Sequence, residues 1–147
     1  MKITYSLLAG AVLGALVSIT SIAMAADSPA SDAVVESKVF IISPANGATV
    51  PTTFTVKFGA AGVDIMPAGT DQPNSGHHHL LIDTDVLPDF HAPLPATPTL
   101  LHFGKAQTEA EITLAPGVHT LQLVLGNYVH IPGEHPLVSE KITVTVK

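Results

Sequence analysis

The sequence predicts an all-β protein, and more narrowly an immunoglobulin-like antiparallel β-sandwich of seven to eight short strands. Runs of β-branched and aromatic residues recur between turns rich in proline, glycine and asparagine. No stretch beyond the N-terminal leader has helical periodicity of useful length. About 120 residues follow that leader, a length that suits one domain built from two packed sheets with Greek-key crossings.

The strands are expected where short apolar runs lie between turn signals. In chain order they are 38–43, 53–58, a short edge piece at 63–66, 77–83, 99–103, 109–114, 118–125 and 137–147. The clearest alternation puts Phe54, Val56 and Phe58 on one face. The strands 109–114 and 118–125 are expected to form a hairpin. Prolines in the connection 87–95 exclude a helix there.

The N-terminus predicts export. Met1-Lys2 begins the chain, an uncharged apolar stretch follows, and Ala23-Met24-Ala25 ends it, the pattern of a secretory signal peptide over residues 1–25. Cleavage is expected after Ala25 or Ala26, and residues 26–37 then form a flexible linker before a single β-sandwich domain over 38–147. An uncleaved membrane anchor is the alternative, but no basic flank follows the apolar stretch. We therefore expect a periplasmic protein with no membrane insertion once the leader is removed.

Composition excludes several classes of partner. The formal net charge is −6 and the chain contains no arginine, so nucleic acid and anionic lipid are unsuitable partners. The absence of cysteine excludes disulfides and thiolate-based metal sites. Met66 is the only methionine after the leader, so the soft donors that favour Cu(I) are nearly missing.

The histidines carry the chemical signal. The chain has eight, all between positions 77 and 135, and three are consecutive at the start of an apolar strand. Alternation along that strand puts His77 and His79 on one face and His78 on the other. If this strand is antiparallel to 118–125, His77 lies beside Leu125 at one end of the sandwich, called the pole here. His102, before the strand 109–114, and His130 and His135, after the strand 118–125, are expected at the same pole.

A pole with several imidazoles predicts a site for a divalent transition metal, Zn(II) or Cu(II), since both accept nitrogen donors from a rigid scaffold. The candidate ligands come from three segments, namely the histidine strand, the 99–103 run and the stretch 127–135, and are His77, His79, His102, His130 and His135. Glu134 or Asp83 is expected as an outer partner that orients a ring nitrogen. His91 and His119 lie at the opposite pole, where a structural role is expected.

Two other functions stay open. One is a structural or interaction module that presents loops to an envelope protein and uses its histidines only for packing or pH sensing. The other is a metal-dependent hydrolase with an open coordination position and Glu134 as its base. Catalysis is the less favoured class, because the chain has no G-x-S-x-G, G-x-G-x-x-G or H-E-x-x-H motif.

A distinctive set of motifs spans about residues 38–147: Ser43-Pro44-Ala45-Asn46-Gly47, Phe54–Gly59, Gly76–Asp83, His102-Phe103-Gly104, Gln107-Thr108-Glu109 and His130-Ile131-Pro132. Together these motifs resemble the bacterial family of exported domains of unknown function numbered 4399. The resemblance implies an exported, single-domain, β-rich protein and assigns no activity. Where the family pattern often continues His-Ile-Pro-His, this chain has Gly133, which removes one donor from the richest version of the site.

Overall fold

The computed structural model describes residues 36–147, so the predicted signal peptide and nearly all of the predicted linker lie outside the described residues. The described residues form strands and no helix, which confirms the all-β prediction. The strands are β1 (Lys38–Ser43), β2 (Thr49–Val50), β3 (Thr53–Ala61), β4 (Asp64–Ile65), β5 (Ser75–Ile82), β6 (Leu100–His102), β7 (Glu109–Thr113), β8 (Gly117–Gly126) and β9 (Ile142–Val146). Residues 36–147 contain no helix long and apolar enough to cross a membrane.

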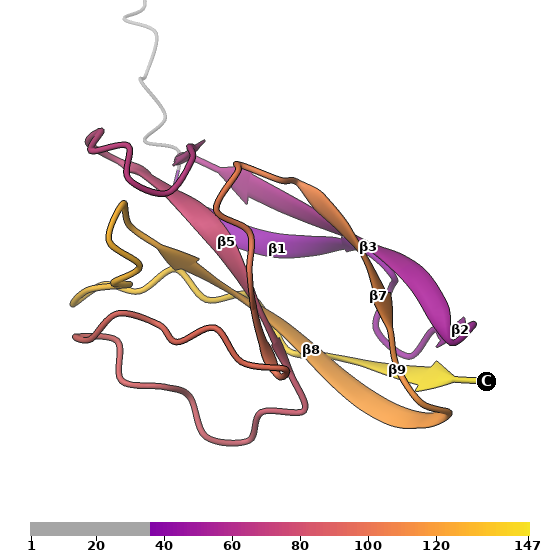
Figure 1. Ribbon diagram of the computed structural model, residues 1–147. Helices are drawn as coiled ribbons and strands as arrows, with labels where there is room; N and C mark the ends of the chain where they lie inside the picture. The colour runs from indigo at the N-terminus through magenta and orange to yellow at the C-terminus, as the bar shows by residue number, and fades with distance from the viewer. Residues whose placement is uncertain (1–35) are drawn as a thin grey trace, which may run out of the picture. The chain divides into compact units, whose positions relative to one another are not determined.

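The strands form two sheets (Figure 1). One has the order β1-β3-β7, and the other has the order β2-β9-β8-β5-β4, with β6 also paired to β5. The described strands outnumber the predicted seven to eight because Thr49–Val50, expected within a loop, pairs in parallel with the last strand. The immunoglobulin-like arrangement of these sheets stays a prediction.

The predicted hairpin between 109–114 and 118–125 is wrong. β7 pairs with β3, and β8 lies between β5 and β9 in the other sheet, so the chain crosses between sheets at this turn. Burial explains the difference. In β7 only Ile112 is buried, as expected for an edge strand, whereas the second half of β8 is buried on both faces, as expected for a central one.

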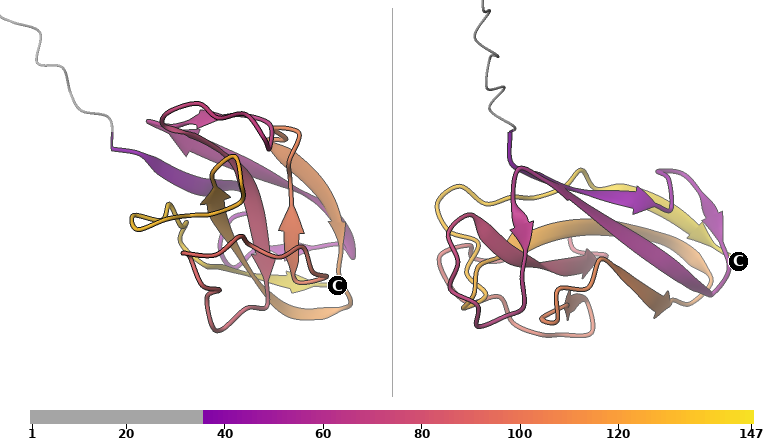
Figure 2. Two further views of the ribbon diagram at one scale, coloured as in Figure 1. Left: turned by 60° about the vertical axis from the view of Figure 1, so that its left-hand side comes forward. Right: turned by 90° about the horizontal axis from the view of Figure 1, so that it is seen from above.

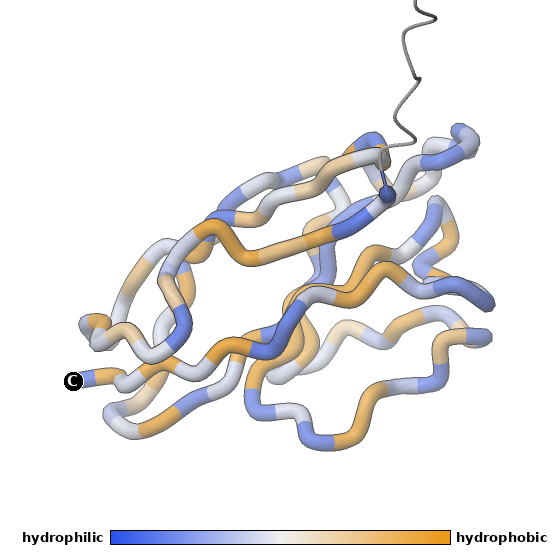
Figure 3. Tube along the Cα trace, turned by 180° about the vertical axis from the view of Figure 1, so that it is seen from behind, coloured by the Kyte–Doolittle hydropathy of each residue, from blue (hydrophilic) through white to orange (hydrophobic). Residues whose placement is uncertain are grey.

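The main core lies between the two sheets. The predicted face of β3 is buried there and meets apolar side chains from alternate positions of β5 and β8. Its buried members include Phe54, Val56, Phe58, Leu80, Ile82, Leu121, Leu123 and Leu125. Apolar and hydrophilic segments alternate along the strands, as expected for strands with one face in the core (Figure 3). Burying each such side chain contributes about 1.5–3 kcal/mol, so this interface fixes the register of β5.

A second apolar cluster covers the other face of β5 and β8. Leu81 and Val124 pack there against Leu94 and Leu100, with Phe90 partly buried beside them. The long connection after β5 lies on this side of the sheet, away from β1 and β3, in both Figure 1 and Figure 2. As a result β5 is buried on both faces, and polar residues on its outer face lie beneath loops.

Candidate metal centre

The floor of the site is the start of β5, where the three consecutive histidines have no solvent-exposed surface. Alternation along the strand separates them as predicted. His77 and His79 lie on the same face of the strand, with their ring centres 4.9 Å apart. His78 points the other way, into the main core, where its ring centre lies 5.3 Å from that of Phe58. The run of three therefore supplies two rings to one site and one ring to the core.

His102 reaches the site through strand pairing. It ends β6, where it is the register partner of His79, so its ring stands beside the outer face of β5. The next residue, Phe103, donates its backbone N–H to the His78 carbonyl at 3.0 Å and buries its ring against Phe58. This bond fixes the strand end that carries the His102 ring, which is itself exposed.

His130 comes from the loop after β8 and adopts a left-handed backbone conformation with φ of 70°. Asn127 holds this loop: its side-chain oxygen accepts hydrogen bonds from the backbone of Val129 and Ile131, and its carbonyl accepts one from His130. The carbonyl of His130 accepts a further bond from Leu94 at 2.9 Å. Left-handed conformations are costly for residues with a Cβ, so this network maintains the conformation that aims the ring.

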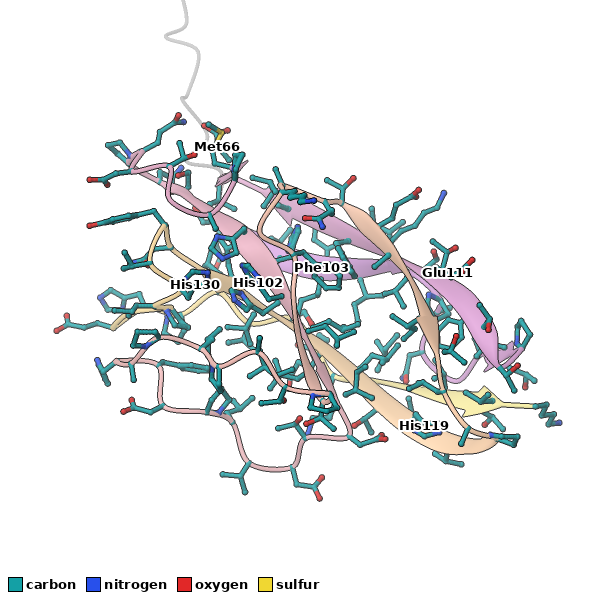
Figure 4. All side chains as sticks on the ribbon, viewed as in Figure 1. Met66, His102, Phe103, Glu111, His119 and His130 are labelled. Atoms are coloured by element: carbon teal, nitrogen blue, oxygen red, sulfur yellow. The ribbon has the colours of Figure 1, made fainter. Side chains whose placement is uncertain are left out.

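These four residues, called the histidine cluster from here on, are His77, His79, His102 and His130. All six pairs of rings are close, with centre distances from 4.7 Å for His102 and His130 to 5.9 Å for His79 and His130. One ring nitrogen from each of His77, His79 and His102 lies within 4.8 Å of the other two. Figure 4 shows His102 and His130 side by side next to β5 and His119 at the far end of the sheet. Three separate segments therefore bring imidazoles to one place.

The buried rings are electrically neutral at physiological pH. Burial, together with the charges that neighbouring histidines would carry, lowers the pKa of His77 from 6.5 to about 4 and that of His79 to about 3. Burial and then the nearby His130 also lower the pKa of His102. Neutral imidazole is the form that coordinates metals, so these rings need no deprotonation before binding.

The same rings lack the hydrogen bonds that buried polar atoms normally make. Among residues 36–147, neither Nδ1 nor Nε2 of His77 or His79 has a partner, although both side chains are fully buried. His119, by contrast, has both ring nitrogens bonded, to Asp83 at 2.6 Å and to the Ala115 carbonyl at 2.9 Å. A metal ion would bind the lone pair of one such nitrogen on each ring. The ring nitrogens of His77, His79 and His102 are close enough together to hold one.

Residues 56–147 match the family described as a domain of unknown function, DUF4399. The chain belongs to this family. The matched range contains the whole histidine cluster and confirms the resemblance seen in the sequence. Comparison with curated proteins finds no match.

Among solved structures, the endo-beta-1,4-mannanase from Thermotoga petrophila is similar with a TM-score of 0.43 and 14% identity. The similarity covers 76% of this chain and 20% of the mannanase chain, so this chain spans about a fifth of that protein.

Two glycines of this DUF4399 domain leave room for the rings, and the sequence pattern alone did not single them out. A Cβ on Gly126 would lie 2.8 Å from Cε1 of His79, and a Cβ on Gly104 would lie 2.4 Å from Cε1 of His102. Both distances are too short for any side chain, so each glycine is required for the ring to take its place. The sequence does contain a signal for such a residue: each glycine lies at or just after the end of a strand that pairs with the histidine strand.

The other predicted site residues lie apart from the DUF4399 histidine cluster. His135 is exposed and lines a separate cavity with Asn74 and Leu137, and none of the six ring pairs includes it. Glu134 is also exposed. Asp83, predicted as an outer partner of the site, instead binds His119 and the backbone N–H of Thr120 at the other end of β5. That prediction failed because Asp83 follows the last residue of β5, four residues beyond His79, and faces His119 there.

Proposed function

We propose that this domain is a periplasmic protein that binds a divalent transition metal, Zn(II) or Cu(II), through His77, His79 and His102. Its role would be metal buffering, delivery or sensing. The observation that carries the proposal is the pair of fully buried rings of His77 and His79, whose four nitrogens have no hydrogen-bond partner among the described residues while a third imidazole faces them.

The energetics favour a ligand role over a packing role for this pair. An unsatisfied buried polar atom costs about 1–3 kcal/mol, a cost that His119 avoids by bonding Asp83 and the Ala115 carbonyl. His78 in the core has the same unpaired nitrogens, so what distinguishes His77 and His79 is that their rings face each other and a third imidazole, His102. A metal with nitrogen ligands at about 2.0 Å removes the cost for one nitrogen on each ring. Both Zn(II) and Cu(II) bind imidazole well, whereas Mg(II) and Ca(II) prefer oxygen donors.

The periplasmic location rests on the leader alone, through its basic start, apolar stretch and Ala23-Met24-Ala25 exit. A site built only from histidines also suits an oxidising compartment, because it contains no thiolate that oxidation would destroy.

We also propose that the fold is immunoglobulin-like. The sheet order β1-β3-β7 corresponds to the A, B and E strands of that fold, and the run β9-β8-β5 corresponds to G, F and C. The crossings from β3 to β5 and from β7 to β8 support the same assignment.

The test is a melting experiment on protein expressed with its own leader and recovered from the periplasmic fraction. The mass of the recovered chain reports cleavage after Ala25 or Ala26. After chelation and dialysis, Zn(II) or Cu(II) at about 100 times its dissociation constant should stabilise the fold by about 2.7 kcal/mol, which raises Tm by roughly 10 °C. Ca(II) should give no shift.

Two variants make this test specific. The double substitution His77→Ala and His79→Ala should abolish the shift, while His91→Ala, which removes an exposed histidine outside the cluster, should leave it intact. An unchanged melting temperature in the original chain with both metals would refute metal binding. Recovery of the chain only from the cytoplasm would refute export.

A further inference from the structure

We infer that His130 is a fourth ligand and that the histidine cluster is a closed, tetrahedral four-imidazole site suited to Zn(II). This inference rests on the proposed metal function and deepens it. It specifies the coordination number and the geometry, and it leaves no coordination position for water or substrate.

Ring distances test this geometry directly. With metal–nitrogen bonds of about 2.0 Å and a ring centre about 1.2 Å beyond each nitrogen, a tetrahedral metal holds all six ring pairs about 5.2 Å apart. The pairs that involve His77 measure 4.9, 5.0 and 4.9 Å, and the remaining three measure 5.2, 5.9 and 4.7 Å. The centres of the four rings therefore lie close to the corners of a tetrahedron, and three of the rings, those of His77, His79 and His102, also have nitrogens within 4.8 Å of one another.

Square-planar coordination, which Cu(II) prefers, requires a different pattern. Four neighbouring ring pairs would lie about 4.5 Å apart and two opposite pairs about 6.4 Å apart. The opposite pairs must share no ring, and the largest such combination here is His79 with His130 at 5.9 Å and His77 with His102 at 5.0 Å. The second of these distances is far too short for a diagonal, so the arrangement disfavours a planar site.

The donor atoms of the outer pair agree with the ring centres. Nε2 of His102 and Nε2 of His130 lie 3.1 Å apart. Two nitrogens on a tetrahedral zinc are separated by about 3.3 Å. Without a metal, one ring must donate a hydrogen bond to the other at this distance. With a metal, both nitrogens would coordinate it. The ring nitrogens of His77, His79 and His102 already lie within 4.8 Å of one another, and His130 is the ring that must turn to join them.

The backbone of His130 gives independent support. Its left-handed φ of 70° is unusual for a residue with a side chain, and the Asn127 network maintains it. Strained backbone of this kind concentrates at functional sites, where the surrounding structure enforces a geometry that the chain would otherwise avoid. Here the enforced geometry places the ring of His130 over the buried pair on β5.

A closed site has a chemical consequence. Catalytic zinc keeps an open position at which bound water ionises near neutral pH, whereas four protein ligands leave none. The cluster also contains no carboxylate, so a bound ion keeps its full double charge. The site is built to hold a metal, and hydrolysis would require one of the four imidazoles to leave.

Co(II) is the probe for this inference, because its visible absorption is strong in tetrahedral sites and weak in five- or six-coordinate ones. The full-length chain, freed of metal and loaded with Co(II), should show strong absorption that does not change between about pH 6.5 and 9, since no bound water ionises. His130→Ala should still bind Co(II), but about 100-fold or more weakly, since even outer partners of ligands account for 10–100-fold. Its spectrum should now change with pH as a newly bound water ionises.

Two further variants control the result. His130→Asn preserves the left-handed turn, because asparagine tolerates this conformation, and should reproduce the effect of His130→Ala. His135→Ala removes the exposed histidine five residues later and should behave like the original chain.

The outcomes separate the two proposals. A weak or pH-dependent Co(II) spectrum in the original chain, unchanged affinity in His130→Ala, or a loss confined to His135→Ala would each overturn the four-imidazole site while metal binding stands. No Co(II) or Zn(II) bound by the original chain would overturn both.

Discussion

Gly126 offers a way to disturb the histidine cluster without removing an imidazole. In Gly126→Ala the new Cβ would lie 2.8 Å from Cε1 and 3.2 Å from Nδ1 of His79, and 3.2 Å from Cα of His130. Carbon contacts are comfortable at about 3.5–4.0 Å, so the closest overlap is roughly 0.7 Å. The backbone cannot easily yield, because Gly126 pairs with His77 in the sheet. The ring of His79 must therefore move.

The size of the effect follows from this overlap. Overpacking a buried site costs about 1–3 kcal/mol, so urea denaturation of the metal-free protein should show a loss in that range. A ring displaced by several tenths of an ångström no longer meets the metal at its bond length. We expect Zn(II) affinity, measured by competition with a chromophoric chelator, to fall by about 10–100-fold, similar to the loss of an outer partner of a ligand.

Two other glycines serve as controls. Gly47→Ala places a side chain at a left-handed position with nothing within 4 Å, so it should cost about 1 kcal/mol and leave Zn(II) affinity unchanged. Gly104→Ala should displace His102, but that ring is exposed and can turn outward, so affinity should fall with little loss of stability. If Gly126→Ala folds and binds Zn(II) as tightly as the original chain, the position assigned to His79 in the site is refuted.

Three more substitutions make separate predictions. His130→Gly should stabilise the metal-free protein by about 0.5–1 kcal/mol in urea, because relief of left-handed strain exceeds the added chain entropy of glycine, while Zn(II) affinity falls. His78→Leu should stabilise the fold by about 1–3 kcal/mol and leave Zn(II) affinity unchanged, because the unpaired ring nitrogens of His78 are buried against Phe58 on the opposite face; a loss of affinity would contradict this. The hydrogen bond that the His119 ring donates to the Asp83 carboxylate raises the pKa of His119, so this pair stabilises the fold fully below pH 6.5 and loses its contribution as pH rises through the raised pKa. The stability difference between the original chain and Asp83→Asn should therefore be larger at about pH 6 than at about pH 9, and equal differences would show that His119 is not charged in the fold.

The sequence was sufficient to predict the inner half of the site. Strand periodicity alone places His77 and His79 on one face, and the expected antiparallel partner puts His77 opposite Gly126, one residue from the predicted Leu125. The rings of the histidine cluster lie at the predicted end of the sheet, although the predicted hairpin was wrong. The turn before β8 reverses the chain direction whether the next strand joins the same sheet or the facing one, so the end of β8 reaches the same pole.

The outer half could be predicted only as a set of candidates. The sequence does not rank His102 and His135 as ligands: His102 follows the short run Leu100-Leu101, His135 follows the turn residues Pro132-Gly133-Glu134, and neither lies in a long strand. What separates them is the pairing of β6 with β5 in a register that places His102 across from His79. Three residues of pairing carry too little pattern to reveal that register in advance. The contribution of His130 depends on a left-handed residue within a loop, which strand periodicity does not predict.

The burial of the histidine strand on both faces connects the fold to the metal proposal. A strand at the surface could offer His77 and His79, but water would satisfy their nitrogens and compete with any ion. Here the main core covers one face of β5, and the connection that contains Leu94 covers the other, so both rings are dehydrated before a metal arrives. Apolar packing during folding offsets the free-energy cost of removing water from the rings of His77 and His79. A metal that binds these nitrogens therefore does not have to displace water from them.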